Sequence, residues 1–280
     1  MLRFNKPLST IKSYANEQSA KLSDKVYENK EKAGSFFSQV ASMAMFFRRI
    51  VIETFSRDFE FKEFLRQCYQ IGTKSFSLVA VTGVIMGVVL AIQSRPALVQ
   101  FGAVSMLPSM VAISLIREIG PVITALLCAG KIGSGIGAEL GSMKVTEQID
   151  AMEVSETNPV RFLVVTRVLA ATLMIPLLVL FADAAGLTGS WIGANIKGDV
   201  KFVLFISQSF GNLNFIDFIP AIIKSVFFGA VIGFVGCYQG FNAGRGTESV
   251  GIAANAAVVM SSLLIIIIDM IAAQVTDIFS

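Results

Sequence analysis

The sequence has 280 residues, of which 54% are hydrophobic and only 15% are charged, so it is too apolar for an ordinary soluble domain. Its formal net charge is +3 and it contains no histidine. The three cysteines lie far apart, at Cys68, Cys128 and Cys237, which argues against a metal site built on His or Cys spacing. We therefore expect an integral membrane protein with no metal and no cofactor, and no nucleic acid among its partners.

Residues 1–45 form a polar N-terminal extension. Residues 1–35 are rich in Lys, Ser and Glu, a composition that favours partial helix or disorder. A basic arm lying on anionic lipid headgroups is the alternative. The extension lacks the short apolar core of a cleaved signal peptide. Thirteen of the 23 basic residues precede residue 75, so the positive-inside rule places the N-terminus in the cytoplasm.

Residues 46–74 are predicted to form an interfacial helix region. Apolar residues, many of them phenylalanine, recur here at helical spacing from residue 36 onward, with basic residues between them. Basic amphipathic helices of this kind lie in the plane of the membrane interface. We therefore expect this region to rest on the membrane before the first crossing.

Residues 75–280 are predicted to form a transmembrane domain of about five helices. Several apolar runs reach the roughly 20 residues that span a bilayer. Runs such as Leu263–Ile268 are apolar at consecutive positions, whereas a transmembrane strand alternates in polarity. Helices, which satisfy their own backbone groups, are the expected spanning elements. The predicted spans are residues 75–94, 104–132, 161–196, 218–240 and 250–276.

Three irregularities accompany these spans. A short turn is expected at Arg95-Pro96, after the first span. Pro108 and Pro121 are expected to interrupt the second span. The third span would be about 52 Å long as one helix, well beyond a hydrocarbon core of about 30 Å. It therefore either breaks near 183–186 or extends outward, and we favour the extension because Trp191 suits an interfacial belt. Residues 197–217 are expected outside the membrane.

A polar segment, residues 137–153, separates the second and third spans and is expected in the cytoplasm. Val145, Ile149 and Met152 fall at i, i+4 and i+7, with acidic residues beside them, which predicts a short amphipathic helix. The pattern alone does not distinguish a docking helix from a solvated loop.

A glycine run overlaps the start of this segment. A phosphate-binding loop needs the pattern G-x-x-x-x-G-K-[ST] between a strand and a helix, and the run does not fit it. Gly133, Gly137 and Gly141 are spaced by four residues, which favours close helix packing instead.

The sequence AELGSMKVTEQIDAM at residues 138–152 resembles the signature of the MlaE/YrbE permease family. Members of this family are membrane subunits of ABC-type lipid transporters that work with MCE-domain proteins. Residues 117–126 and 223–227 carry further family-like sequence at matching places. The resemblance covers about residues 50–280 and does not extend to residues 1–45.

The resemblance implies an interfacial helix followed by five membrane helices in the inner (cytoplasmic) membrane. It also implies that two copies pair around a cavity that holds phospholipid. The segment with the signature is similar to a coupling helix that seats on a cytoplasmic ATPase subunit. The candidate residues for this ATPase coupling are Glu139, Lys144, Glu147, Gln148 and Asp150.

Three charged residues, Glu118, Lys224 and Asp269, lie within apolar runs. A charge at the centre of the bilayer costs about 2.5–3.5 kcal/mol on insertion scales, so each should face protein or a wet cavity. They are either partners in structural salt bridges or the polar lining of a lipid cavity, in which Lys224 would meet a headgroup phosphate. The sequence does not indicate which of them pair.

Two functions of different classes remain. The first is the permease subunit of an ATP-driven lipid transporter, with no nucleotide site of its own. The alternative is an ion-coupled secondary transporter that works without an ATPase and uses Glu118 or Asp269 as a proton or cation site. The absence of a recognisable internal repeat disfavours the alternative. An intramembrane enzyme is disfavoured because no catalytic pairing is visible.

Overall fold

The computed structural model describes most of the chain, namely residues 38, 40–55, 59–196, 198, 200–211, 213 and 215–279. Most of the predicted polar extension therefore lies outside the described residues. The chain divides into two compact units, Met1–Arg49 and Ile50–Ser280. Residues 40–54 are helical, and Phe47 and Ile52 are exposed on this helix. Its location in the membrane interface stays a prediction.

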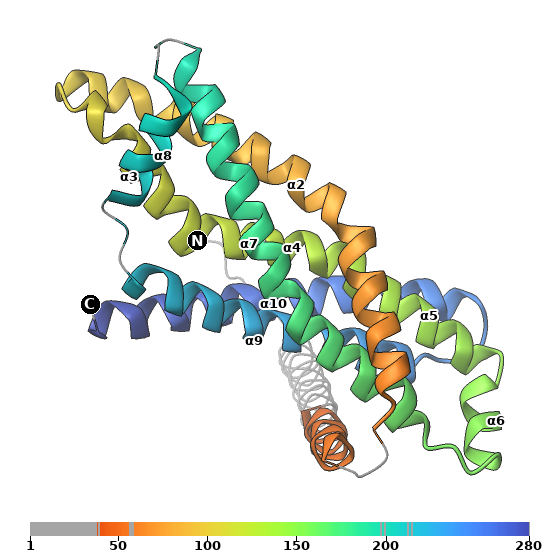
Figure 1. Cartoon of the computed structure of the whole chain (residues 1–280). Coiled ribbons are helices and arrows are strands. Elements are labelled where there is room, and N and C mark those ends of the chain that lie inside the picture. The colour runs from red at the N-terminus through yellow and green to blue at the C-terminus, as the bar shows by residue number, and fades with distance from the viewer. Residues whose placement is uncertain are drawn as a thin grey trace, which may run out of the picture. The chain divides into compact units, whose positions relative to one another are not determined.

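The described secondary structure is entirely helical, and five helical stretches are long and apolar enough to cross a membrane (Figure 1). They are Phe61–Gln100, Val104–Val145, Val160–Asn195, Asp217–Phe241 and Glu248–Thr276. This confirms the predicted all-α membrane fold with five spans.

The first span is longer than predicted. Helix α2 runs without interruption from Phe61 to Gln100, so residues 61–74 belong to the same helix as the predicted span 75–94. The predicted turn at Arg95-Pro96 is wrong, because Pro96 lies inside α2. Only four helical residues follow this proline, so the helix loses one backbone hydrogen bond close to its end. Arg95 Nη1 also donates to the Ala194 carbonyl at 2.8 Å and fastens this end of α2 to the third span.

The second span is a series of helical segments. After a short 3-10 turn at Val104–Met106, it contains α3 (Leu107–Ser114), a π-helical segment (Leu115–Ile119), α4 (Gly120–Cys128), a second π-helical segment (Ala129–Gly133) and α5 (Ser134–Val145). Pro108 stands in the first turn of α3, and Pro121 stands in the first turn of α4, directly after the π-helical segment. A proline has no N–H to donate, so Pro121 leaves one carbonyl of the preceding turn without its helical partner. The Gly120 N–H donates to the Leu115 carbonyl five residues back, which widens the turn before Pro121. The predicted interruption is therefore a local π-helical turn.

The third span is one long element, as we favoured. A π-helical segment, Val160–Val165, leads into α7 (Thr166–Asn195), which continues through residues 183–186 without a break. The fourth and fifth spans, α9 (Phe215–Phe241) and α10 (Glu248–Phe279), agree with their predicted ranges.

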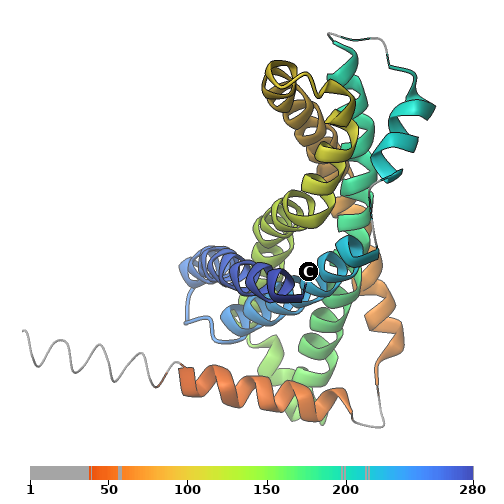
Figure 2. The same cartoon turned by 90° about the vertical axis from the view of Figure 1, so that its left-hand side faces the viewer.

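Helix α8 (Phe202–Gly211) was not predicted within residues 197–217. Its Phe205 is fully buried with Leu107, Val111 and Ala194. Ser109 Oγ in α3 donates to the Gln208 carbonyl of α8 at 2.8 Å. Helix α8 thus covers the ends of α3 and α7, as Figure 2 shows.

Helices α2 and α7 lie side by side over most of their lengths (Figure 1). Glycines bring their backbones into contact. A Cβ at Gly87 would lie 1.9 Å from the Gly186 carbonyl oxygen, and one at Gly189 would lie 2.1 Å from the Val84 carbonyl oxygen. Any side chain at these positions would therefore force the two helices apart.

Replacing Gly87 with valine should destabilise the protein by at least the roughly 1–3 kcal/mol typical of overpacking, because the obstacle is backbone. Thermal unfolding of the purified protein in detergent would measure this. Gly130→Val is the matched control, since nothing lies within 4 Å of a Cβ at that position. Equal melting temperatures for the two variants would contradict the packing account.

Gly137 and Gly141 in α5 face α10, as the glycine spacing predicted. A Cβ at Gly137 would lie 3.3 Å from the Ala253 carbonyl oxygen, and one at Gly141 would lie 3.6 Å from Val250 Cα. A Cβ at Gly133 would have more room, since the nearest atom, in the Ile232 side chain of α9, would lie 3.7 Å away. The glycine face thus serves helix packing.

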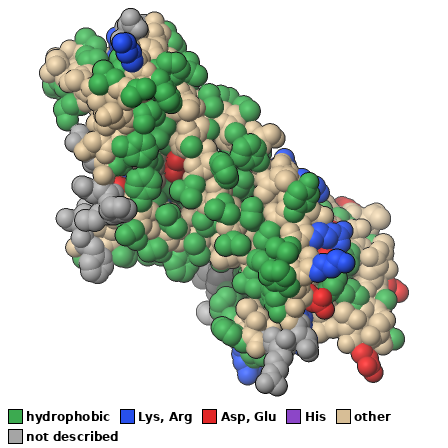
Figure 3. Space-filling view, in the orientation of Figure 1, with side chains coloured by type: hydrophobic (Ala, Val, Ile, Leu, Met, Phe, Trp, Pro, Cys, Tyr) green, Lys and Arg blue, Asp and Glu red, His purple; other side chains and the backbone are tan. Residues whose placement is uncertain are grey.

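Hydrophobic side chains cover the middle of the face drawn in Figure 3. Most of the charged side chains visible there gather towards the end that carries α5 and the short helix α6 (Gln148–Val154). An apolar band beside a charged end is the surface expected of a protein embedded in lipid.

Candidate functional site

The structure brings the three predicted intramembrane charges together. Lys224 of α9 is 4% exposed, and its Nζ lies 2.8 Å from Glu118 Oε2 and 3.0 Å from Asp269 Oδ1. Glu118 belongs to the π-helical segment before α4, and Asp269 belongs to α10. We call these three residues the charge triad. Three spans far apart in the sequence meet at this one ammonium group.

The charge triad is stabilised by its own pairing but is not electrically neutral. With all three groups ionised it carries one excess negative charge. Glu118 is its most accessible member, with a side chain 42% exposed against 22% for Asp269. Because an unpaired charge inside a membrane is costly, this excess is favourable only where water or a cationic group can reach it.

A cavity of about 480 Å³ opens beside the triad, between α9 and α10. Among the described residues that line it, Lys224 is the only charged one. The other lining residues are Pro220, Ile223, Phe227, Ile268, Ile271, Ala272, Val275 and Thr276. An apolar cavity with a single charged group at its wall matches the chemistry of an amphiphile, which has hydrocarbon chains and a polar head.

The candidate coupling segment differs from the single amphipathic helix that we predicted. Helix α5 ends at Val145, and α6 begins at Gln148 after a turn. Glu147 in this turn has φ 59°, in the left-handed region. The predicted apolar stripe therefore holds for Ile149 and Met152, which are three residues apart in α6 and are its least exposed residues. Val145 does not continue that stripe along one helix, because it is the last residue of α5.

Helix α6 is nonetheless fixed to the rest of the protein. Ile149 is 1% exposed, and Lys144 Nζ of α5 lies 2.7 Å from Asp150 Oδ1 of α6. Glu147 and Gln148 are exposed. Of the five candidate coupling residues, these two and the Lys144–Asp150 pair lie at the surface around the turn.

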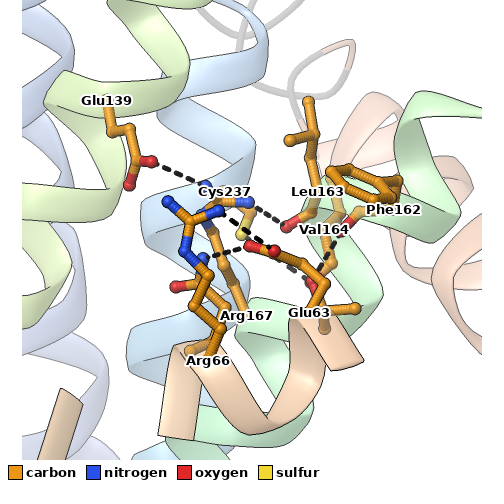
Figure 4. Close-up of polar contacts among 10 residues, drawn as sticks. Glu63, Arg66, Glu139, Phe162, Leu163, Val164, Arg167 and Cys237 are labelled. Carbon is orange, nitrogen blue, oxygen red and sulfur yellow. Dashed lines mark hydrogen bonds and ion pairs between the residues drawn. The ribbon is translucent and has the colours of Figure 1, made fainter. Parts of the chain in front are cut away.

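Glu139, the fifth candidate, has a structural partner (Figure 4). Its Oε1 accepts from Arg167 Nη2 at 2.8 Å, and Arg167 Nη1 donates to the Leu163 carbonyl at 2.9 Å. The Arg167 side chain is only 3% exposed, whereas that of Glu139 is 50% exposed. The pair ties α5 to α7, so a movement of the coupling segment would act directly on the third span.

Sequence reasoning did not identify two buried charged residues in the third span, Arg167 and Asp183. Asp183 is 6% exposed, and a Cβ at Gly120 would lie 1.9 Å from its Oδ1. The sequence pattern could have identified both, since each is a charged residue inside a predicted span. Arg167 is near the span's inner end, and Asp183 was considered only as a possible break.

Five apolar helical spans, a buried charge triad beside an apolar cavity and a polar turn between the second and third spans define a multi-pass membrane protein suited to transport. A family model described as Permease MlaE matches residues 64–275. The chain belongs to the MlaE permease family.

Named relatives agree with this assignment. A probable ABC transporter permease protein from Rickettsia typhi is 39% identical over 203 residues, covering 72% of this chain and 78% of the relative. A probable ABC transporter permease protein from Pyropia yezoensis is 30% identical over 84% of this chain and 90% of its own length. The intermembrane phospholipid transport system permease protein MlaE from Haemophilus influenzae is 32% identical over 74% of this chain and 80% of its own length.

Proposed function

We propose that this chain is the permease subunit of an ATP-driven transporter that moves phospholipid between the membrane and an MCE-domain partner. In this proposal two copies pair in the inner (cytoplasmic) membrane, each with its N-terminus in the cytoplasm, and ATP is hydrolysed by a separate subunit. The observation that carries the proposal is the charge triad at the wall of the apolar cavity. The name of the Haemophilus influenzae relative supports phospholipid as the cargo.

The energetics of lipid extraction support a separate energy source. Removing two 16-carbon acyl chains from a bilayer costs roughly 25 kcal/mol at about 0.8 kcal/mol per methylene group. A sheltered apolar path lowers this cost, and ATP hydrolysis in a partner subunit would drive the remainder. The sequence of this chain contains no phosphate-binding loop.

The Lys224 ammonium uses two of its three N–H donors on the carboxylates, so a headgroup phosphate can take the third donor or replace one carboxylate. Glu118 is the more exposed of the two carboxylates, so we expect the phosphate to replace Glu118 rather than Asp269 on Lys224. A zwitterionic headgroup carries both required charges, because its phosphate replaces Glu118 on Lys224 while its ammonium group pairs with Glu118. Each charged group of the triad and of the headgroup then has a partner of opposite charge, and no charge is left alone in the membrane.

The turn at Glu147 and helix α6 are the proposed seat of the ATPase subunit. The acidic side chains there are exposed, whereas Ile149 and the Lys144–Asp150 ion pair hold the segment in place. A force on α6 would reach α7 through the Glu139–Arg167 pair.

Purification and reconstitution test this proposal against an ion-coupled carrier. We expect an ATPase to co-purify with the chain from its native membrane, and we expect lipid transfer in liposomes only with that subunit and ATP. Lipid or solute transport by the isolated chain, driven by an ion gradient without ATP, would support the carrier instead.

A further inference from the structure

A second cavity, of about 200 Å³, lies between α2 and α5 at the end of the spans next to α6. Unlike the cavity beside the charge triad, it is lined largely by polar side chains. We call it the lysine cavity, and its lining residues are Gln67, Gln70, Ile71, Lys74, Ser75, Lys131, Ile132, Gly135, Ile136 and Glu139.

Three side chains give the lysine cavity the chemistry of an anion site. Lys74 and Lys131 approach from neighbouring elements, and Lys131 Nζ donates to the Lys74 carbonyl. Among the described residues neither lysine forms an ion pair. Ser75 is 1% exposed, and its Oγ has no hydrogen-bond partner in the described structure. A buried hydroxyl without a partner is costly, and an oxyanion in the cavity would satisfy it.

The one carboxylate in the lining, Glu139, does not cancel this positive charge. It is already paired with Arg167 at 2.8 Å. Gln67 Nε2 likewise donates to Glu63 Oε1 at 2.7 Å, so its amide is oriented by a neighbour on the same helix. The two lysines therefore remain the charged groups that are available to a ligand.

The position of Lys74 along α2 places the lysine cavity at headgroup depth. The helix carries no charged residue between Lys74 and Arg95. These 21 steps of helix correspond to about 32 Å, which is close to the thickness of a hydrocarbon core of about 30 Å. Lys74 and Arg95 thus mark the two edges of the apolar layer, and Lys74 lies at the edge on the α6 side.

We propose that the lysine cavity binds the phosphate group of a phospholipid in the leaflet on the α6 side. Lys74 and Lys131 would pair with the phosphate, and Ser75 Oγ would donate to one of its oxygens. The site is separate from the charge triad and does not depend on the transport assignment. A lipid bound there would bridge α2 and α5 next to the Glu139–Arg167 pair.

Native mass spectrometry of the full-length protein in detergent, titrated with phosphatidylglycerol, tests the proposal. The double variant Lys74→Gln/Lys131→Gln should bind one lipid fewer, with affinity at this site falling about 25-fold, since each lysine near a lipid phosphate contributes roughly fivefold. The matched control is Lys62→Gln/Arg245→Gln, which removes two positive charges outside the cavity and should bind as the parent does. Ser75→Ala should weaken the same site by about fivefold, the effect of one lost hydrogen bond.

Two results would overturn the proposal. Lipid binding by the double variant and by Ser75→Ala equal to that of the parent would mean that water fills the cavity. Displacement of the lipid by millimolar inorganic phosphate would mean that the site takes a free anion instead of a headgroup. Should the double variant fail to fold, Ser75→Ala still decides the question, because it removes only an unpartnered oxygen. These outcomes are independent of the charge triad, so they leave the transport proposal standing.

Discussion

Replacing Lys224 with methionine is expected to destabilise the protein by roughly 3–5 kcal/mol, the usual effect of removing one partner of a buried ion pair. The lysine is 4% exposed and is within 3.0 Å of carboxylates on two other spans. Without it, Glu118 and Asp269 remain as unpaired negative charges inside the apolar layer. Thermal or denaturant unfolding in detergent would measure the loss.

A neutral triple variant, Glu118→Gln/Lys224→Met/Asp269→Asn, separates the structural role of the triad from its proposed role in lipid binding. It leaves no unpaired charge within the triad, so its stability should lie much closer to that of the parent than the stability of Lys224→Met does. Its capture of phospholipid should still fall at least about tenfold, which corresponds to the loss of one charge-assisted contact with the headgroup. If the triple variant is stable and recovers as much lipid as the parent does, the triad is a structural salt bridge only.

Reversing the charge of two exposed acidic residues, in Glu147→Lys/Asp150→Lys, is expected to reduce ATP-driven lipid transfer at least about tenfold. The ATPase surface that binds an acidic α6 is expected to be basic. Lysines on α6 would then face like charges across the interface, which costs several kcal/mol and prevents binding. Membrane insertion should be unchanged. The melting temperature should fall only slightly, because both side chains are exposed and the lost Lys144–Asp150 ion pair, itself at the surface, contributes at most about 1 kcal/mol. Transfer and ATPase rates of the reconstituted complex would measure the effect.

Glu156→Lys is the matched control for this coupling variant. Like Glu147, Glu156 is exposed and has a left-handed φ, of 60°, but it lies at the other end of α6, in the loop that follows the helix. Any effect of a lysine at a left-handed position, or of one reversed surface charge, should therefore appear in both variants. Equal transport by Glu147→Lys/Asp150→Lys and by the parent would rule out α6 as the coupling element.

The number and order of the spans could be predicted because each apolar run is long enough to cross a bilayer. Helix ends were less predictable. Residues 61–74 carry charges that suggested an interfacial helix, but the structure continues them into α2. Proline at residue 96 suggested a turn, although a helix tolerates proline close to its end. Helix α8 was not predicted because its ten residues, most of them apolar, are too few to indicate a span.

The candidate site was predictable in its members but not in its pairings. Charged residues in apolar runs identified Glu118, Lys224 and Asp269, whereas their meeting depends on how three spans cross. Lys224 is 106 residues from Glu118 and 45 from Asp269, and no local pattern links them. The left-handed turn at Glu147 could not be predicted either, because a glutamate seldom adopts that conformation.

The most direct test of the central claim is a cryo-electron microscopy map of the complex purified from its native membrane with its bound lipid. We expect a headgroup within hydrogen-bonding distance of Lys224 Nζ, acyl chains in the cavity between α9 and α10, and a soluble ATPase subunit seated on α6. A map in which another protein helix fills that cavity and leaves Lys224 paired only with Glu118 and Asp269 would contradict it.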